Sequence, residues 1–323
     1  MMIKRIGLLT SGGDAPGMNA AIRSVVRYGL HYNLEVIGIY RGYAGLINED
    51  LESLDHRSVA GIINRGGTIL ESLRCDEFLT EEGQRKAVEV LKRHSIDALI
   101  VIGGDGTYRG AIALWERWHI PCVGVPATID NDINGTDFTI GADTAINTAI
   151  EAVDKIRDTS LSMSRIFVVE VMGRESGFIA SQVALACGAE EVLVPEITYD
   201  LGDMYHDVAK GCLKDKDRWI IIVAEGEDAK AKEIVKKIAE MIGSETREVV
   251  LGHIQRGGSP TAQDRLLATR FGAAAVDLIL NNEFGKAIAV KGNQILAVDL
   301  HLAVDKKNGQ MVKSSYQLMR HLT

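Results

Sequence analysis

The sequence predicts an α/β fold built on mostly parallel β-sheets, and three observations support this prediction. Short apolar runs rich in β-branched residues are each followed by glycine or polar residues and then by a stretch with helical spacing. This order recurs along the chain, as expected for parallel strands joined by crossover helices. The 323 residues are enough for two domains or one large α/β unit, and no Pro- or Ser-rich linker separates two halves. If two domains are present, we expect the chain to cross between them more than once.

Each predicted strand is a short apolar run of the kind that is buried in a parallel sheet. In chain order these strands cover residues 6–9, 35–39, 98–102, 122–125, 165–171, 191–194, 219–223 and 249–251. Each predicted helix is a stretch in which apolar residues recur at helical spacing. In chain order these helices cover residues 17–30, 81–94, 108–115, 142–158, 177–186, 227–242 and 261–281.

Composition and charge argue against several classes of protein. The net charge is −8, with 36 basic and 44 acidic residues, so we expect no broad nucleic-acid surface, although a local basic pocket for phosphates is compatible with it. The four cysteines form no CxxC pair, which predicts neither a zinc site nor a disulfide framework. No apolar run approaches the roughly 18 residues needed to span a bilayer. We expect a soluble, unexported protein of the cytoplasm.

Polar and glycine residues gather at the predicted strand ends. They read TSGGDAPG at 10–17, GGDGTYRG at 103–110, PATIDNDING at 126–135, MGRESG at 172–177, AEGE at 224–227 and GHIQRGGSP at 252–260. In open α/β sheets, ligands bind beyond the carboxyl ends of the strands. A purely structural sheet needs small turn residues there but has little use for so many Asp, Arg and Thr side chains.

The loop after the strand at 98–102 has the composition of a phosphate-binding turn. Its glycines would let backbone N–H groups approach phosphate oxygens, and the following helix would add a favourable dipole. Asp105 could then hold Mg²⁺. A plain strand-to-helix turn is the alternative interpretation. The chain has neither GxxxxGK[ST] nor a GxGxxG after its first strand, which argues against a Walker P-loop and a dinucleotide site.

The segment 126–132 follows another predicted strand and carries two aspartates. If it is extended, Thr128, Asp130 and Asp132 share one face, because side chains alternate along a strand. Two carboxylates directed into one cleft repel each other, so one of them would suit an acid or base role unless a cation lies between them. An Asx-rich loop that satisfies its own backbone is the alternative.

Arginines at the predicted strand ends suggest a sugar-phosphate pocket. Arg165 and Arg174 flank one strand, and Arg247 and Arg256 flank another together with His253. The planar guanidinium suits a phosphate dianion better than an ammonium does. Each arginine alone fits an ordinary surface position, but four of them in an acidic protein favour the pocket.

The motifs in combination resemble the ATP-dependent phosphofructokinases of bacterial type. The similar stretches cover nearly the whole chain: LTSGGDAPGMNAAIR at 9–23, NRGGTIL at 64–70, VIGGDGTY at 101–108, TIDNDINGTDFTIG at 128–141, IRDTS at 156–160, VVEVMGR at 168–174 and VLGHIQRGGSPTAQDR at 250–265. The resemblance implies two Rossmann-like sandwich domains with the chain crossing between them. Residues 1–140 plus 256–304 would bind ATP, and residues 141–255 plus 305–323 would bind fructose 6-phosphate.

The resemblance also implies roles for individual residues. Asp130 would be the general base, with Thr128, Asp132 and Arg174 as further catalytic residues. ATP would contact Gly13, Arg74, Cys75, Gly104, Asp105, Gly106 and Thr107, with Asp105 on Mg²⁺. Fructose 6-phosphate would contact Thr128, Ile129, Asp130, Met172, Gly173, Arg174, Glu225, His253, Ile254, Gln255 and Arg256. Arg165 and Arg247 would reach that substrate from a neighbouring subunit of a homotetramer.

The same resemblance implies an effector site for ADP or phosphoenolpyruvate. The matching positions are Arg23, Arg27, Arg157, Gly188, Glu190, Lys214 and Lys216. Gly106 favours ATP as donor, because pyrophosphate-using relatives typically carry Asp there. Ala127 and Phe178 depart from the family pattern, in which glycine and an acidic residue are usual. A pyrophosphate-dependent enzyme and a catalytically silent sugar-phosphate sensor remain as alternatives.

Overall fold

The computed structural model describes residues 3–163, 165–198, 200–212, 218–226, 231–243 and 245–323. The chain forms two compact units, Met1–Thr144 with Arg256–Lys307 and Ala145–Gln255 with Asn308–Thr323. Each unit is an α/β sandwich around its own sheet, so the predicted fold class is confirmed. The assignment of ATP to one domain and fructose 6-phosphate to the other stays a prediction.

A seven-stranded sheet forms the centre of the first unit, in the order β11-β10-β5-β4-β1-β2-β3. Its strands are β1 (Arg5–Ser11), β2 (Glu35–Ile39), β3 (Leu51–Leu54), β4 (Ala98–Gly103), β5 (Cys122–Pro126), β10 (Lys286–Lys291) and β11 (Gln294–Asp299). All neighbours are parallel except β2 with β3 and β10 with β11, which are antiparallel. The antiparallel strands therefore lie at the two edges of the sheet.

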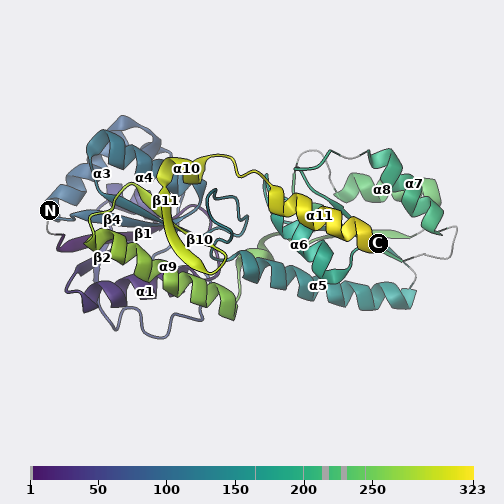
Figure 1. The fold of residues 1–323 in the computed structure, drawn as a ribbon, viewed down its shortest axis with the longest axis horizontal. Coiled ribbons are helices and arrows are strands. Elements are labelled where there is room, and N and C mark those ends of the chain that lie inside the picture. Colours follow the sequence, from purple (N-terminus) through teal and green to yellow (C-terminus); the bar gives the residue numbers. More distant parts are fainter. Residues whose placement is uncertain (1–2, 164, 199, 213–217, 227–230, 244) are drawn as a thin grey trace. The chain divides into compact units, whose positions relative to one another are not determined.

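Helices cover both faces of this sheet (Figure 1). They are α1 (Met18–His31) and α9 (Ala262–Leu280) on one face, and α2 (Gly42–Ile47), α3 (Glu81–Arg93), α4 (Asp105–Trp118) and α10 (Leu300–Val304) on the other, with a short 3-10 helix at Glu77–Leu79. Leu9, Leu99 and Val101 of the central strands are fully buried against the second group of helices. Burial on both faces explains why these strands read as continuous apolar runs.

The second unit has a four-stranded parallel sheet in the order β7-β8-β6-β9. Its elements are β6 (Ile166–Val171), β7 (Glu191–Leu193), β8 (Trp219–Ala224) and β9 (Thr246–Val250), with α5 (Ala142–Met163), α6 (Phe178–Cys187), α7 (Leu201–Cys212), α8 (Ala231–Ile242), a 3-10 helix at Gly252–Arg256 and α11 (Gln310–Leu322). Helices α7 and α8 share a core with Ile166, Ile221 and Val223 of the sheet. Among the described residues, no helix combines the length and apolar character needed to cross a bilayer.

All eight predicted strands are present, but three strands of the seven-stranded sheet and four helices were missed. β3, β10 and β11 were not predicted, nor were the helices α2, α7, α10 and α11. β11 is only partly buried along its length, so it lacks the continuous apolar pattern that marks the central strands. α4 begins at Asp105, three residues before the predicted start, so part of the glycine-rich stretch at 103–110 belongs to its first turn.

Candidate functional site

The glycine loop (residues 103–110) and the acidic loop (residues 127–141, between β5 and α5) lie next to each other in the first unit. They follow β4 and β5, which are parallel neighbours, so both loops leave the same edge of the sheet. The Ala127 N–H donates to the Gly103 carbonyl at 3.0 Å. A Cβ atom placed on Gly104 would lie 3.5 Å from Cβ of Thr128. One small ligand could therefore contact both loops.

The glycine loop ends in a helix start that is open to an anion. Gly103 has no room for a side chain, since an added Cβ would lie 2.3 Å from Thr107 Oγ1 and 2.6 Å from the Ser11 carbonyl oxygen. Gly104 caps α4 without a side-chain hydrogen bond, so the backbone N–H groups of the first turn remain available. Gly106 is exposed, and an added Cβ would meet no atom within 4 Å. The buried Thr107 hydroxyl donates to Ser11 O at 3.0 Å, so it ties α4 to β1.

Asp105 is the residue predicted to hold a metal ion. It is partly exposed, and Arg109 one helical turn later approaches its Oδ1 at 3.0 Å. The described residues contain no group of three or more His, Cys, Asp or Glu side chains that could hold an ion by themselves. A single carboxylate at a helix start fits Mg²⁺ that keeps its waters and binds mainly through substrate phosphates.

The acidic loop is not extended, which corrects the argument that placed Thr128, Asp130 and Asp132 on one face. Residues 129 and 130 form a turn, and Asn131 has a left-handed φ of 48°. Alternation of side chains does not apply to such a segment. Asp130 is 6% exposed, whereas Asp132 is partly exposed, so the two carboxyl groups have different surroundings. The Asp130 N–H donates to Thr128 Oγ1 at 3.3 Å.

A network of hydrogen bonds braces this loop from within. The Thr139 hydroxyl donates to the Thr128 carbonyl at 2.6 Å. The Asn131 side-chain amide donates to the Asp137 carbonyl at 2.9 Å and its Oδ1 accepts from the Thr139 hydroxyl at 3.3 Å. The loop is thus held in one shape before any ligand binds, which is what a site needs if it is to act by positioning.

The remaining predicted ATP residues lie on loops that leave β1 and its neighbourhood. Thr10 Oγ1 donates to the Glu71 carbonyl at 2.6 Å, which attaches the segment carrying Arg74 and Cys75 to the end of β1. Arg74 is exposed, and Cys75 packs against the core. The Arg256 guanidinium fills the space over Gly13, where an added Cβ would lie 2.5 Å from Nη1. Gly13 and Arg256 were predicted to bind different substrates, but the structure places them side by side.

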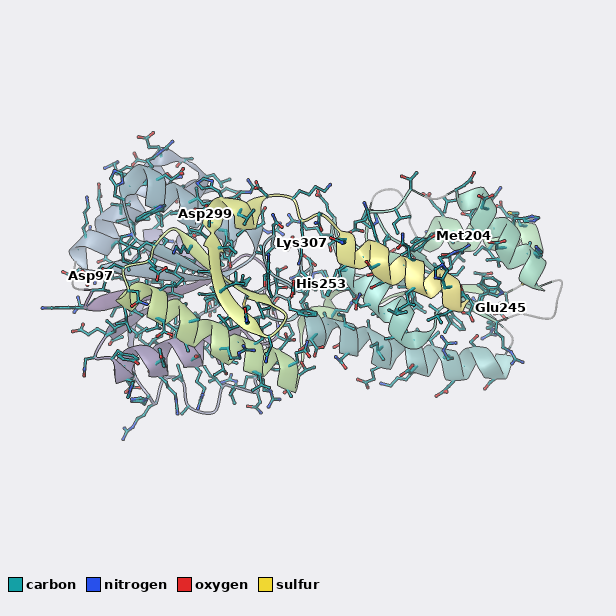
Figure 2. The ribbon with its side chains drawn as sticks, in the orientation of Figure 1. Asp97, Met204, Glu245, His253, Asp299 and Lys307 are labelled. Carbon is teal, nitrogen blue, oxygen red and sulfur yellow. The ribbon has the colours of Figure 1, made fainter. Side chains whose placement is uncertain are left out.

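The second unit gathers its predicted substrate residues, apart from Arg165 and Arg247, at the carboxyl ends of its strands. The Met172 N–H donates to Gln255 Oε1 at 2.9 Å, and the Glu225 N–H donates to the Val171 carbonyl at 2.8 Å. A tight turn follows β6, because a Cβ on Gly173 would lie 2.2 Å from the Ser176 carbonyl. The exposed Arg174 has a left-handed φ of 58°, a conformation that non-glycine residues adopt rarely. His253, labelled in Figure 2, and Ile254 are exposed on the 3-10 helix.

The four arginines do not form one pocket within the chain. Arg165 directly precedes β6 and Arg174 follows it, so about 20 Å of strand separates them. Arg165 approaches Glu245 Oε2 at 2.7 Å, and Arg247 pairs with the other oxygen of the same carboxylate. These two arginines lower the pKa of Glu245, with the Arg165 hydrogen bond as the largest cause. Glu245, labelled in Figure 2, was not singled out by the sequence because single surface glutamates are common.

The residues matched to an effector site are distributed over both units. Arg23 and Arg27 lie one turn apart on α1, and burial together with the neighbouring Arg27 lowers the pKa of Arg23. Arg157 Nη2 donates to the Gly188 carbonyl at 3.2 Å, and Glu190 Oε2 accepts from the Ile220 N–H at 2.8 Å. Lys214 and Lys216 lie outside the described residues.

Two residues near the candidate site were missed. Lys307 Nζ donates to the Asn131 carbonyl at 2.9 Å, across 176 positions of sequence. Asp264 is 1% exposed and accepts hydrogen bonds from the Gly141 and Thr144 N–H groups at 2.9 and 2.8 Å. Asp264 belongs to the family-like motif at 250–265, and this motif could have drawn attention to it. Nothing in the local sequence around Lys307 indicates its contact with Asn131.

Comparisons with known proteins point to one family. A family model described as phosphofructokinase matches residues 5–279. The ATP-dependent 6-phosphofructokinase of Halothermothrix orenii is 52% identical, over 99% of this chain and 100% of its own length. That of Bacillus cytotoxicus is also 52% identical, with the same coverage of both chains. A solved phosphofructokinase structure from Saccharomyces cerevisiae matches with a TM-score of 0.86 and 35% identity, over 99% of this chain and 47% of that one.

Proposed function

This chain belongs to the phosphofructokinase family, and on that premise we propose that it transfers the γ-phosphoryl group of ATP to the 1-hydroxyl of fructose 6-phosphate. The product would be fructose 1,6-bisphosphate, which makes the protein an ATP-dependent 6-phosphofructokinase of glycolysis. The observation that carries the proposal is the adjacency of the glycine loop and the acidic loop. We also propose that the protein is located in the cytoplasm.

The acidic loop would supply the chemistry. Phosphoryl transfer passes through a loose transition state, so the protein mainly aligns the attacking and leaving oxygens. Asp130 would accept the proton of the 1-hydroxyl as the new O–P bond forms, and Thr128 and Asp132 would support it. Arg174 would offset the charge of the moving phosphoryl group. The internal hydrogen bonds of the loop support this role, because a general base must be held in place before the reaction.

The glycine loop would bind the nucleotide. The open backbone N–H groups at the start of α4 favour phosphate oxygens, and the helix dipole adds to this preference. The proposed ATP contacts are Gly13, Arg74, Cys75, Gly104, Asp105, Gly106 and Thr107. Asp105 would hold Mg²⁺, which when bound would neutralise charge on the phosphates.

The second unit would bind the sugar phosphate. The proposed contacts are Met172, Gly173, Arg174, Glu225, His253, Ile254 and Gln255, together with Arg256 of the first unit and Ile129 of the acidic loop. Arg165 and Arg247 would act in the site of a neighbouring subunit of a homotetramer. Their pairing through Glu245, at the end of β6 opposite to Arg174, supports a role away from the site of their own chain.

The effector site belongs to the same proposal. ADP or phosphoenolpyruvate would bind at Arg23, Arg27, Arg157, Gly188, Glu190, Lys214 and Lys216. The hydrogen bond between Arg157 and the Gly188 carbonyl supports a shared site for those two residues.

Donor choice separates this proposal from its main alternative, a pyrophosphate-dependent enzyme. An aspartate at position 106 would repel the α-phosphate of a nucleotide, whereas Gly106 leaves that space open. The test is steady-state turnover with ATP or pyrophosphate across a titration of fructose 6-phosphate, with and without ADP. We expect turnover with ATP and little with pyrophosphate. Turnover with pyrophosphate alone would establish the alternative, and turnover with neither donor would favour a silent sugar-phosphate sensor.

A further inference from the structure

The segment 303–307, which follows β11 and ends the first unit, contacts both candidate loops. The Ala303 carbonyl accepts from the Asn134 N–H at 3.1 Å. The Val304 carbonyl accepts from Arg109 Nη2 at 3.4 Å, and the same arginine pairs with Asp105. Lys307, labelled in Figure 2, donates to the Asn131 carbonyl at 2.9 Å. The segment is therefore placed to fix the acidic loop from outside.

Asn131 is the residue of the acidic loop that the segment 303–307 holds through Lys307. Its left-handed φ of 48° is uncommon for a residue with a Cβ, although asparagine adopts it more readily than most, and the residue is only 2% exposed. A strained conformation persists only where the surroundings over-determine it. The side-chain amide of Asn131 is already bonded within the loop, so Lys307 adds the bond that fixes its main-chain carbonyl.

The charge on Lys307 also acts on the loop. Burial lowers the pKa of Lys307 to about 8, while the carboxylates of Asp132 and Asp137 favour its charged form. At neutral pH the ammonium is therefore mostly charged although it is partly removed from water. A desolvated ammonium is costly unless polar or charged groups compensate it, and here the Asn131 carbonyl accepts its hydrogen bond while Asp132 and Asp137 favour its charge. Asp305 and Lys306 of the same segment are exposed.

We propose that Lys307 is a positioning residue for phosphoryl transfer, which holds the Asn131 peptide so that Asp130 and Asp132 keep their directions. The inference rests on the proposed function, because it assigns Lys307 to the loop that carries the general base. Lys307 would act through the loop and not on the reacting atoms. Small displacements of a base lower the rate of the chemical step far more than they weaken binding of the nucleotide.

The test compares Lys307→Met, Lys307→Arg and Lys306→Met in the full chain. Lys307→Met keeps the approximate length of the side chain but removes its charge and its hydrogen bond. Lys307→Arg keeps the positive charge and the ability to donate a hydrogen bond. Lys306→Met removes a neighbouring exposed lysine as the matched control. For each protein, kcat and KM for ATP and fructose 6-phosphate are measured, with thermal unfolding and hydrogen–deuterium exchange of the peptide that covers residues 128–139.

We expect Lys307→Met to lower kcat roughly 10-fold or more, with KM for ATP changed less than about 3-fold. Exchange at residues 128–139 should become faster, Lys307→Arg should recover most of the loss, and Lys306→Met should behave as wild type. An unchanged kcat, a loss confined to KM, or an equal loss in Lys306→Met would overturn the inference. Wild-type turnover in the same assay tests the proposed function separately, and the exchange comparison tests the support of the loop even if no donor gives turnover.

Discussion

Asp130 and Asp132 lie two residues apart in the acidic loop but in different surroundings. The turn at residues 129 and 130 and the left-handed Asn131 direct the chain so that Asp130 is nearly buried and Asp132 is not. A carboxylate that is shielded from water and fixed by its loop suits a general base, because it need not reorganise when the proton moves.

Asp130→Ser tests this assignment. The serine cannot accept the proton of the 1-hydroxyl, so we expect kcat to fall on the order of 10²-fold or more while ATP still binds. Steady-state kinetics and calorimetric titration with ATP measure the two effects, and thermal unfolding shows whether the variant is folded. Near-normal kcat would remove Asp130 from the role of base.

Asp264 gives a pH-dependent prediction at the same scale. Burial raises its pKa from 3.8 to about 6, against the opposing hydrogen bonds from Thr144 and Gly141. The native carboxyl group thus holds its proton more tightly than the unfolded one, so this group's contribution to stability falls as pH rises from about 4 to about 6, by roughly 3 kcal/mol in all.

Asp264→Asn removes this titration. We expect the free energy of unfolding of the wild type, relative to that of the variant, to decrease as the pH is raised from 4 to 6. Urea unfolding at a series of pH values measures it, with Asp76→Asn at an exposed position as the control. A difference that stays constant across this range would show that the carboxyl group does not titrate there.

At the scale of elements, the β10–β11 hairpin anchors the acidic loop to the sheet. Thr136 Oγ1 accepts from the Val290 N–H at 3.0 Å, and the Val290 carbonyl accepts from the Asp137 N–H at 2.8 Å. Asp137 Oδ2 accepts from the Gly292 N–H at 2.7 Å. The hairpin was not predicted, yet it determines where the carboxyl end of the loop lies.

Thr136→Val tests this anchor, because it keeps the side-chain shape but removes the hydroxyl. The buried Val290 N–H would lose its acceptor, which we expect to destabilise the fold by about 1–3 kcal/mol. Thermal and urea unfolding measure the loss, and Thr136→Ser, which keeps the hydroxyl, serves as the matched control. Equal stability of the valine and serine variants would show that this hydrogen bond contributes little.

At the scale of the whole molecule, the positions of the arginines require more than one chain if all four serve the substrate. Arg165 and Arg247 meet at Glu245, whereas Arg174 lies at the other end of β6. The side chains of Arg165 and Arg174 cannot reach each other across the length of β6. The proposed sharing of sites between subunits removes this conflict.

Mixing two inactive variants tests shared sites. Asp130→Ser and Arg165→Ala would each impair every site of their own homotetramers. After joint unfolding and refolding, mixed oligomers would contain some sites with both native residues, so we expect activity above that of either variant alone. Mixed oligomers with no gain in turnover would show that Arg165 does not act in a partner's site.

The amino-acid sequence by itself determined the central strands, the glycine and acidic loops and their place at the carboxyl ends of β4 and β5. These features are encoded within a few neighbouring residues, as apolar runs and as glycine and aspartate clusters. The family resemblance followed from the same local motifs.

Only the tertiary structure decided which distant residues meet. The Lys307 ammonium on the Asn131 carbonyl and the Arg256 guanidinium over Gly13 have no local signature. β3 and β11, the two edge strands of the seven-stranded sheet, were also missed, because a partly exposed strand is stabilised by pairing with its neighbour and not by its own apolar pattern. Contacts across more than a hundred residues depend on how the whole chain packs, which composition and periodicity do not specify.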